Sequence, residues 1–415
     1  MQEYEPGRRT APRPAAVRRG PAGGRGALTR RSLLRASGAG ALALGLGALS
    51  ACGIPPAKRD GGGAAASDDH SGREKRVTFS NWTEYMDIGE DGRRHPTLDA
   101  FTERTGITVK YTEDINDNVE FFGKVRPQLA AGQDTGRDLL VVTDWLAARI
   151  IRLGWAQKLD PANLPHAFAN LTAQFRAPDW DPGRAYSYPW SGIPTVIAYN
   201  ARATGGRTVD SVTQLLDDPR LKGRVSFLSE MRDSVGMTLL DMGRDPASFT
   251  DADYGEAIAR LQDGVDRKQI RRFTGNDYTA DLSKGDIAAC VAWAGDIVQL
   301  QADNPDIKYA IPDAGYVTAT DNLLVPVKAR HKTNAERLID HYYQPRVAAR
   351  LAAYINYVCP VDGVAAELAA IDPAMASNTL ILPDERTTAR SHAFRSLDPD
   401  EETAYEEKFA TLLGA

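Results

Sequence analysis

The chain has 415 residues, 42% of them hydrophobic, and a formal net charge of −5. Residues 1–51 hold nine Arg and two Glu, so removing them takes away +7 and leaves −12 on the remainder. That acidic remainder argues against nucleic acid as a partner, and its length predicts two lobes rather than one core.

Residues 1–51 are predicted to be an export signal rather than part of the fold. The segment Thr29–Arg35 resembles a twin-arginine signal. The uncharged run at 36–51 is shorter than the roughly 20 residues of a membrane-spanning helix. It closes with L-S-A-C ending at Cys52, which resembles a bacterial lipoprotein box. We expect a lipidated Cys52 and a protein anchored by that lipid alone to the outer face of the cytoplasmic membrane; the alternative is an ordinary exported protein with a chance Cys.

Residues 52–75 are predicted to be a flexible tether, because they are rich in Pro, Gly and polar residues and lack apolar periodicity. Beyond Cys52, the sequence holds two further cysteines, Cys290 and Cys359. In an exported protein they pair or stay as free thiols, and the sequence leaves both alternatives open.

An alternating α/β pattern follows, with apolar runs typical of buried parallel strands. In the first part of the chain we expect strands at 76–79, 107–111 and 138–142, and helices at 96–104, 119–131 and 146–153. Two extended stretches, 186–200 and 320–326, are predicted to cross between lobes. In the rest we expect strands at 224–228, 286–293 and 308–312, and helices at 237–242, 334–343, 347–354 and 404–413.

Aromatic and acidic residues recur where predicted strands end. In open α/β sheets, ligands bind at the carboxyl ends of the strands. Aromatic rings attract an alkylammonium group and a carboxylate gives it a charge-assisted hydrogen bond. The alternative is that the rings serve packing and the acids are solvated. The residues in question are Trp82, Glu84 and Tyr85; Asp144 and Trp145; and Trp293 and Asp296.

Several stretches, in order, resemble the substrate-binding proteins of polyamine ABC transporters, the spermidine/putrescine-binding family. The likeness spans nearly all of 76–415 and is strongest at N-W-T-E-Y (81–85), D-L-L-V-V (138–142), W-A-G-D (293–296) and 321–326. It implies an α/β, two-lobe periplasmic-binding-protein clamp of type II with crossing strands. One lobe would hold 76–194 plus 321–366, and the other 195–320 plus 367–415. It also implies a monomer that delivers a polyamine to an ABC transporter permease.

The resemblance also implies roles for individual residues. Matched by position, the family pattern gives aromatic residues that box the ligand, residues of one cavity wall, acids that bind the amines, and three further positions. No cofactor or metal is expected. The box is Trp82, Trp145, Trp293 and Tyr357; the wall is Thr83 and Tyr85; the acids are Glu84, Asp233, Asp296 and Asp321; the further positions are Glu230, Thr143 and Asp144.

Two departures from the family pattern bear on the ligand. Ala319 stands where a second-lobe Trp is common, which predicts a wider or differently shaped pocket, and Gly275 replaces a Ser. The W-A-G-D motif is closer to the putrescine-type branch. One alternative is the same clamp with another cationic solute, since fold does not fix ligand. A second is an exported enzyme that uses its carboxylates, but no metalloprotease, nucleophile-elbow or Walker motif is present, so no enzymatic activity is expected.

Overall fold

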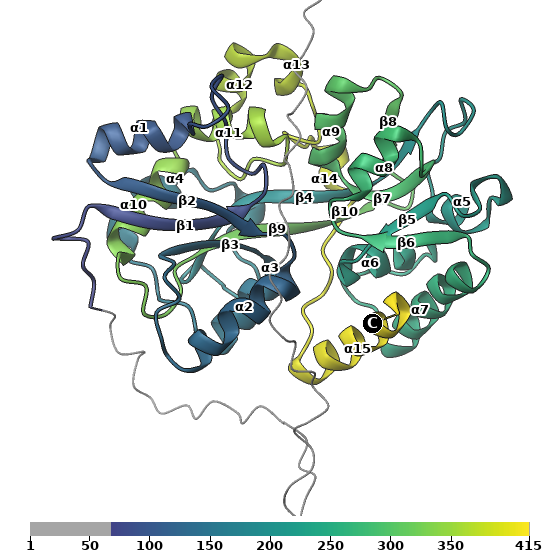
Figure 1. The fold of residues 1–415 in the computed structure, drawn as a ribbon, viewed down its shortest axis with the longest axis horizontal. Helices are drawn as coiled ribbons and strands as arrows, with labels where there is room; N and C mark the ends of the chain where they lie inside the picture. The colour runs from purple at the N-terminus through teal and green to yellow at the C-terminus, as the bar shows by residue number, and fades with distance from the viewer. Residues whose placement is uncertain (1–67, 415) are drawn as a thin grey trace, which may run out of the picture. The chain divides into compact units, whose positions relative to one another are not determined.

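One mixed sheet runs through the part of the chain that the computed structural model describes, residues 68–414 (Figure 1). The predicted export signal, the lipidated Cys52 and most of the predicted tether lie outside these residues. The strand order is β2-β1-β3-β9-β4-β7-β5-β6, with β8 paired to β4 and β10 to β9. The strands are β1 Arg76–Trp82, β2 Thr108–Ile115, β3 Leu139–Thr143, β4 Ser187–Asn200, β5 Val225–Leu228, β6 Ile270–Thr274, β7 Ala289–Trp293, β8 Ile307–Ala310, β9 Tyr316–Leu324 and β10 Ser391–His392.

Helices cover both faces of this sheet. Those near the first strands are α1 Pro96–Thr105, α2 Asn118–Ala130, α3 Asp144–Arg152, α4 Pro165–Asn170, α10 Lys332–Tyr342, α11 Pro345–Ile355, α12 Ala365–Ile371 and α13 Pro373–Ala376. The others are α5 Val212–Asp217, α6 Met231–Asp241, α7 Asp251–Asp266, α8 Tyr278–Lys284, α9 Ala294–Asp303, α14 Glu385–Thr388 and α15 Pro399–Leu413. Three short 3-10 turns lie at Pro161–Asn163, Ala173–Phe175 and Pro219–Leu221.

The first lobe is built on the parallel strands β1, β2 and β3, together with β9 and the first half of β4. Its strands carry apolar side chains on both faces, as buried parallel strands do. In β3, Val141 belongs to the apolar cluster that includes α10 and α11, whereas the neighbouring Val142 belongs to the cluster that includes α2 and α3. The alternation explains why this strand reads as one continuous apolar run.

The second lobe has one core, formed around β5, β7 and the second half of β4. Helix α15 contributes Tyr405 and Phe409 to this core, so the C-terminal helix belongs to the second lobe. Helix α6 begins at Met231, six residues before the predicted helix at 237–242. Helix α7 and strand β6 were not predicted from the sequence. The polar outer face of α7 and the arginines of β6 make the periodicity of their apolar residues weak.

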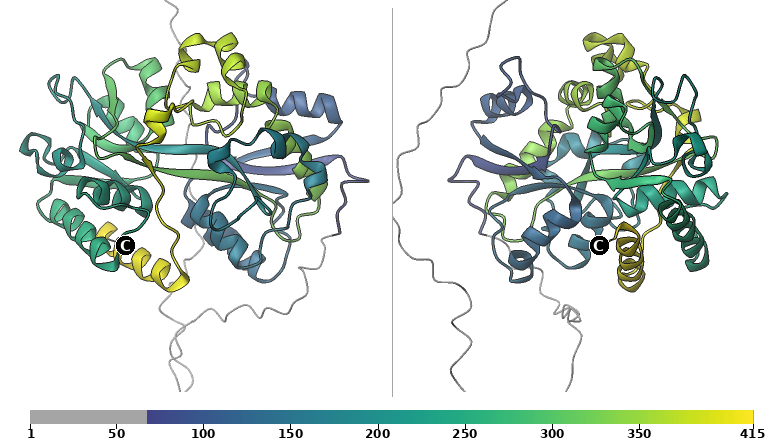
Figure 2. Two further views of the ribbon diagram at one scale, coloured as in Figure 1. Left: turned by 180° about the vertical axis from the view of Figure 1, so that it is seen from behind. Right: turned by 45° about the vertical axis from the view of Figure 1, so that its right-hand side comes forward.

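Strands β4 and β9 cross between the lobes, as predicted. All 14 residues of β4 are buried; residues 187–194 pair with β9 and residues 195–200 with β7 and β8. Figure 2 shows the same strands from behind, running from one group of helices to the other. The expected α/β clamp with two lobes and crossing strands is therefore confirmed.

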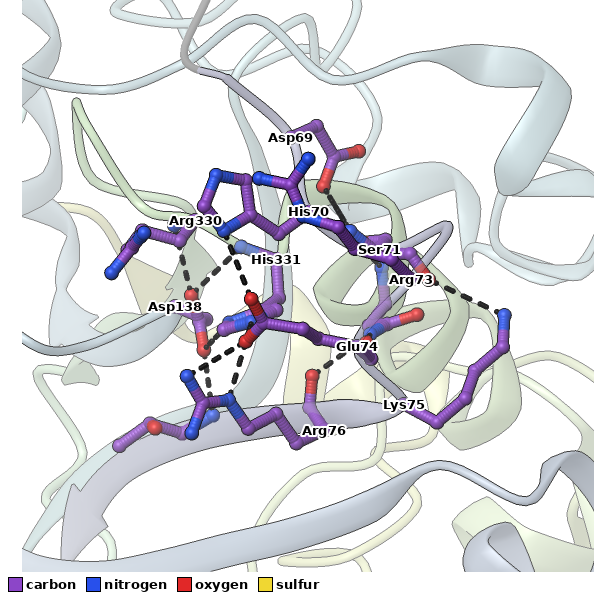
Figure 3. Close-up of polar contacts among 12 residues, drawn as sticks. Asp69, His70, Ser71, Arg73, Glu74, Lys75, Arg76, Asp138, Arg330 and His331 are labelled. Atoms are coloured by element: carbon purple, nitrogen blue, oxygen red, sulfur yellow. Dashed lines mark hydrogen bonds and ion pairs between the residues drawn. The ribbon is translucent and has the colours of Figure 1, made fainter.

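Residues 69–75, which the sequence assigns to the tether, are bonded to the first lobe (Figure 3). His331 lies between two carboxylates, with Nδ1 3.0 Å from Asp138 and Nε2 3.1 Å from Glu74. Asn334 donates to the carbonyl oxygen of Glu74 at 2.9 Å. These contacts between residues 69–75 and the first lobe were not predicted, because they are made by polar side chains that show no periodicity. Among residues 68–414, no helix combines the length and the apolar character that a membrane span requires.

Candidate functional site

A cavity of about 260 Å³ lies between the two lobes, at the ends of β1, β3 and β7. The second lobe contributes the first turns of α6 and α9, which carry Asp233 and Asp296. Strand ends and helix N-termini thus converge on one space, the arrangement that open α/β folds use for ligands.

All but two of the predicted site residues line this cavity. They are Trp82, Thr83, Glu84, Tyr85, Thr143, Glu230, Asp233, Trp293, Asp296, Asp321 and Tyr357. Asp144 and Trp145 line a second, neighbouring cavity instead.

The lining of the first cavity is strongly acidic: it includes no Lys, Arg or His among the described residues. Transfer of so many carboxylates from water to a protein cavity is unfavourable unless a cation compensates them. Its carboxylates are Glu84, Asp117, Glu230, Asp233, Asp296 and Asp321.

Asp296 and Glu84 are one pair of interacting acids in the cavity lining. Asp296 accepts hydrogen bonds from the hydroxyls of Tyr278 at 2.6 Å and Tyr357 at 2.8 Å. Burial raises the pKa of Asp296, and the charge of Glu84 raises it further. Glu84 itself is exposed and has a left-handed backbone, with φ of 57°, a conformation that is uncommon outside Gly and concentrates at functional sites.

Asp321 and Asp233 are a second pair of interacting acids in the lining. Thr143 lies directly opposite Asp321 in the β3–β9 pair and donates its hydroxyl to the carboxylate at 2.9 Å. Burial raises the pKa of Asp321 to about 7, and the neighbouring Asp233 contributes to the increase.

Asp233 is held by two residues that face each other across β4 and β7. The Thr195 hydroxyl and the Trp293 indole N–H both donate to it, the latter at 3.2 Å. Burial raises the pKa of Asp233 to about 6. Trp293 is thereby fixed at the cavity wall with part of its ring exposed.

The aromatic rings of the cavity are held by hydrogen bonds and close packing. Trp82 donates its indole N–H to the Val141 carbonyl at 3.1 Å. The rings of Tyr85 and Tyr357 meet edge to face, with centroids 5.5 Å apart. The Tyr357 ring packs so closely on α9 that a Cβ on Gly295 would lie 2.4 Å from it. Only glycine therefore fits in the W-A-G-D motif at this position.

Asp144 and Trp145 lie where α3 begins, and the helix turns them toward the second cavity. Trp145 donates its indole N–H to Glu230 at 3.3 Å. The Trp145 ring lies close to two guanidinium groups, Arg149 at 5.0 Å and Arg232 at 4.5 Å from its centroid. The protein's own cations thus already contact this ring.

Glu230 lines both cavities and is half-buried at the N-terminus of α6. Burial raises the pKa of Glu230 to about 8, against the opposing effect of Arg232, whose guanidinium lies 3.7 Å away.

Several residues that line the cavity were not predicted from the sequence; they come from loops and helix starts. Asp117 caps the N-terminus of α2, and Asn118 donates to the Thr143 hydroxyl at 2.8 Å. Asn276 donates to Asp296 at 2.9 Å. For Asp117 and Asn118, the sequence did offer a signal: an Asp-Asn pair directly before an apolar helix. Both departures noted in the sequence, Gly275 and Ala319, also line the cavity.

A family model for bacterial extracellular solute-binding proteins matches residues 97–381. Among curated proteins, the chain is 27% identical to a spermidine/putrescine-binding periplasmic protein of Salmonella typhimurium, over 90% of this chain and 96% of the relative. It is 29% identical to a putrescine-binding periplasmic protein of Escherichia coli, over 68% of this chain and 77% of the relative.

Solved structures show the same fold. A spermidine/putrescine ABC transporter substrate-binding protein of Streptococcus pneumoniae superposes with a TM-score of 0.68 at 19% identity, over 82% of this chain and 98% of that one. The TpPotD lipoprotein of Treponema pallidum gives a TM-score of 0.69 at 18% identity, over 82% of this chain and all of the other. Since the family model covers more than half of the sequence, the chain belongs to the bacterial extracellular solute-binding protein family.

Proposed function

We propose that the first cavity captures a polyamine of the putrescine or spermidine kind and that the protein delivers it to an ABC transporter permease. The observation that carries this proposal is the acidic, aromatic cavity whose lining has no basic side chain. A cationic ligand compensates the negative charge of the buried carboxylates, whereas an anionic ligand would increase the free-energy cost of burying them.

Two pairs of acids favour a ligand with at least two ammonium groups. The charge of Asp233 raises the pKa of Asp321, and the charge of Glu84 raises the pKa of Asp296. A quaternary ammonium ligand needs an aromatic cage and little else. The half-buried rings of Trp82 and Trp293 are suited to cover the methylenes between two amines. The names of the curated relatives, which refer to spermidine and putrescine, support the same class.

The ligand contacts in this proposal are the predicted site residues that line the first cavity. Asp144 and Trp145 act on the ligand site indirectly: Trp145 donates to Glu230, and both residues line the second cavity. The proposed lobe boundaries are those drawn from the sequence, with residues 69–75 added to the first lobe and residues 367–382 moved to it, because Leu368 and Ile381 belong to its apolar cluster.

Tryptophan fluorescence titration with putrescine, spermidine, agmatine and choline tests the proposal, because Trp82 and Trp293 line the cavity. We expect saturable quenching or enhancement by putrescine or spermidine and none by choline. Mass spectrometry of small molecules released from the purified protein identifies the natural ligand. A response to choline alone would reject the polyamine class.

We also propose that the protein is not an enzyme. Among the described residues, the lining of the first cavity holds no His, Cys or Lys. Its carboxylates accept hydrogen bonds from Thr and Tyr hydroxyls and indole N–H groups, a set that suits the enclosure of a cation. Putrescine and spermidine should be recovered unchanged after long incubation, and more than one equivalent of product would refute this.

A further inference from the structure

A second cavity, of about 820 Å³, adjoins the first. Strand β9 separates them: Asp321 lines only the first cavity, and Thr318 and Thr320 line only the second. Four residues line both, namely Thr143, Glu230, Asp233 and Ala319. These four residues form a rim that the two cavities share, and the side chain of Ala319 there is small.

The second cavity differs from the first in charge, because four arginines line it. Three of them have carboxylate partners within the protein. Arg152 and Arg232 both bind Glu402, at 2.8 Å and 3.0 Å, and Arg395 binds Glu401 at 2.7 Å.

Arg184 is the exception. It is 5% exposed and forms no ion pair within the described residues 68–414. Burial lowers its pKa, and the more distant charges of Asp181 and Asp144 oppose that effect. Its hydrogen-bond acceptors are neutral: the Phe175 carbonyl at 2.7 Å, the Ser187 hydroxyl at 3.1 Å and the Asn322 amide oxygen at 2.9 Å. The Nη2 group donates no hydrogen bond within the described part of the chain.

The surroundings hold this guanidinium in place. It lies over the ring of Trp180, 5.4 Å from the centroid. The residue has a left-handed backbone with φ of 54°, which an L-residue adopts only when its neighbours impose it. The nearby Asp181 uses its carboxylate to accept three backbone N–H groups and the Ser187 hydroxyl. A buried guanidinium that forms no ion pair is costly, and its remaining Nη2 donor is suited to a charge-assisted hydrogen bond with a ligand carboxylate.

We propose that the second cavity receives a carboxylate-bearing extension of an amine held in the first cavity, with Arg184 as the partner of that carboxylate. The inference rests on the proposed function, because the amine end occupies the polyamine site. The ligand class is a diamine acylated on one nitrogen by a chain that ends in a carboxylate.

The layout of β9 matches this class. Arg184 binds Asn322, which is three residues from Ala319 on the strand, or about 10 Å. The free ammonium binds among the acids of the first cavity. The neutral amide passes the rim, where Glu230 and Asp233 would repel a charge of their own sign. The terminal carboxylate then reaches the arginine.

Calorimetry with two ligands tests the proposal: mono-N-succinylputrescine and mono-N-acetylputrescine. Both have one ammonium and one amide, and only the first has a carboxylate. A charge-assisted pair predicts that wild-type protein binds the succinyl compound at least about tenfold more tightly. Arg184→Gln should bring the ratio of the two dissociation constants close to one.

Ala148→Trp provides a second variant in case Arg184→Gln fails to fold. Ala148 lines only the second cavity, one helical turn after Asp144 on the same face of α3. Its indole should fill the space that the extension needs and lower the ratio as well. A tenfold ratio that survives in a folded form of either variant overturns the inference.

The proposed function and the second-cavity inference would be overturned by different results. If wild-type protein binds none of putrescine, spermidine and the two acylated amines, the proposed function itself is wrong. If it binds putrescine but shows equal affinity for the succinyl and acetyl compounds, the proposed function stands and the second-cavity inference is overturned.

Discussion

Glu402 of the second lobe accepts a hydrogen bond of 2.8 Å from Arg152 of the first lobe. The same carboxylate, 4% exposed, accepts bonds from Arg149 at 3.2 Å and Arg232 at 3.0 Å. One buried acid on α15 therefore binds side chains of both α3 and α6 and links the two lobes.

Glu402→Gln should weaken the ligand-bound form and speed ligand release. The substitution removes the most buried carboxylate that these arginines bind, and Arg152 loses its partner, whereas Arg149 keeps Glu406 at 2.8 Å. The loss of one charged hydrogen-bond partner costs about 1–3 kcal/mol. Chemical unfolding and stopped-flow release measure the two effects. Glu120→Gln is the control, because its i,i+4 pair with Lys124 is exposed and should contribute less than about 0.5 kcal/mol. Equal behaviour of the two variants would contradict the assigned role of Glu402.

Asp321→Ala should weaken diamine binding more than Trp293→Ala. Removal of the acid leaves one ammonium buried without its partner, at a cost of about 3–5 kcal/mol. Removal of the ring loses about 0.5–2 kcal/mol of cation–π attraction, together with packing against the methylenes. Calorimetry with putrescine gives both values. Near-wild-type affinity in Asp321→Ala would remove the main support for a diamine spanning the cavity.

Ligand affinity should rise with pH between about 6 and 8. Burial raises the pKa values of Asp233 to about 6, Asp321 to about 7 and Glu230 to about 8 in the empty cavity. A cationic ligand prefers the ionised carboxylates, so binding releases protons within this range. Calorimetry in buffers of different ionisation enthalpy measures the release. A pH-independent affinity would show that these acids do not contact the ligand.

The empty protein should respond to pH in the opposite direction. These carboxyl groups have higher pKa values in the folded chain than their ordinary 3.8 or 4.5. Their contribution to stability is therefore complete below about pH 4 and disappears as the pH rises through 6 to 8. The unfolding temperature of ligand-free protein should fall over that range, and less so in Asp321→Asn.

Gly295→Ala should destabilise the protein, because its new Cβ would lie 2.4 Å from the Tyr357 ring. Overpacking of this kind typically costs about 1–3 kcal/mol. Gly275→Ala is a matched control at the same cavity, since a Cβ there meets nothing within 4 Å. Thermal unfolding compares the two. Similar stability of both variants would mean that Tyr357 moves aside easily.

Cys52→Ala should release the protein from the membrane if Cys52 carries the lipid anchor. The prediction rests on the L-S-A-C sequence that ends there and on the Thr29–Arg35 motif. Fractionation of cells that express each form shows where the mature chain lies. A variant that stays in the membrane fraction after signal removal would disprove the anchor.

The sequence predicted the strand tips of the site well, because apolar runs such as 138–142 end abruptly in polar and aromatic residues. It did less well at Asp144 and Trp145, since the point at which a helix starts decides which way such residues face. Loop residues such as Asn276 carry no periodicity, so only the folded chain shows that they reach Asp296. The second cavity depends on the packing of segments far apart in sequence, and no local pattern predicts it.

The two remaining cysteines are free thiols, one in the core of each lobe: Cys290 in the second and Cys359 in the first. Both are buried, and burial raises the pKa of Cys359 to about 12. A thiol reagent can therefore modify each only when its own lobe opens. In protein without Cys52, timed alkylation would report the opening rate of each lobe separately, with no engineered label, and would show which lobe a bound ligand protects.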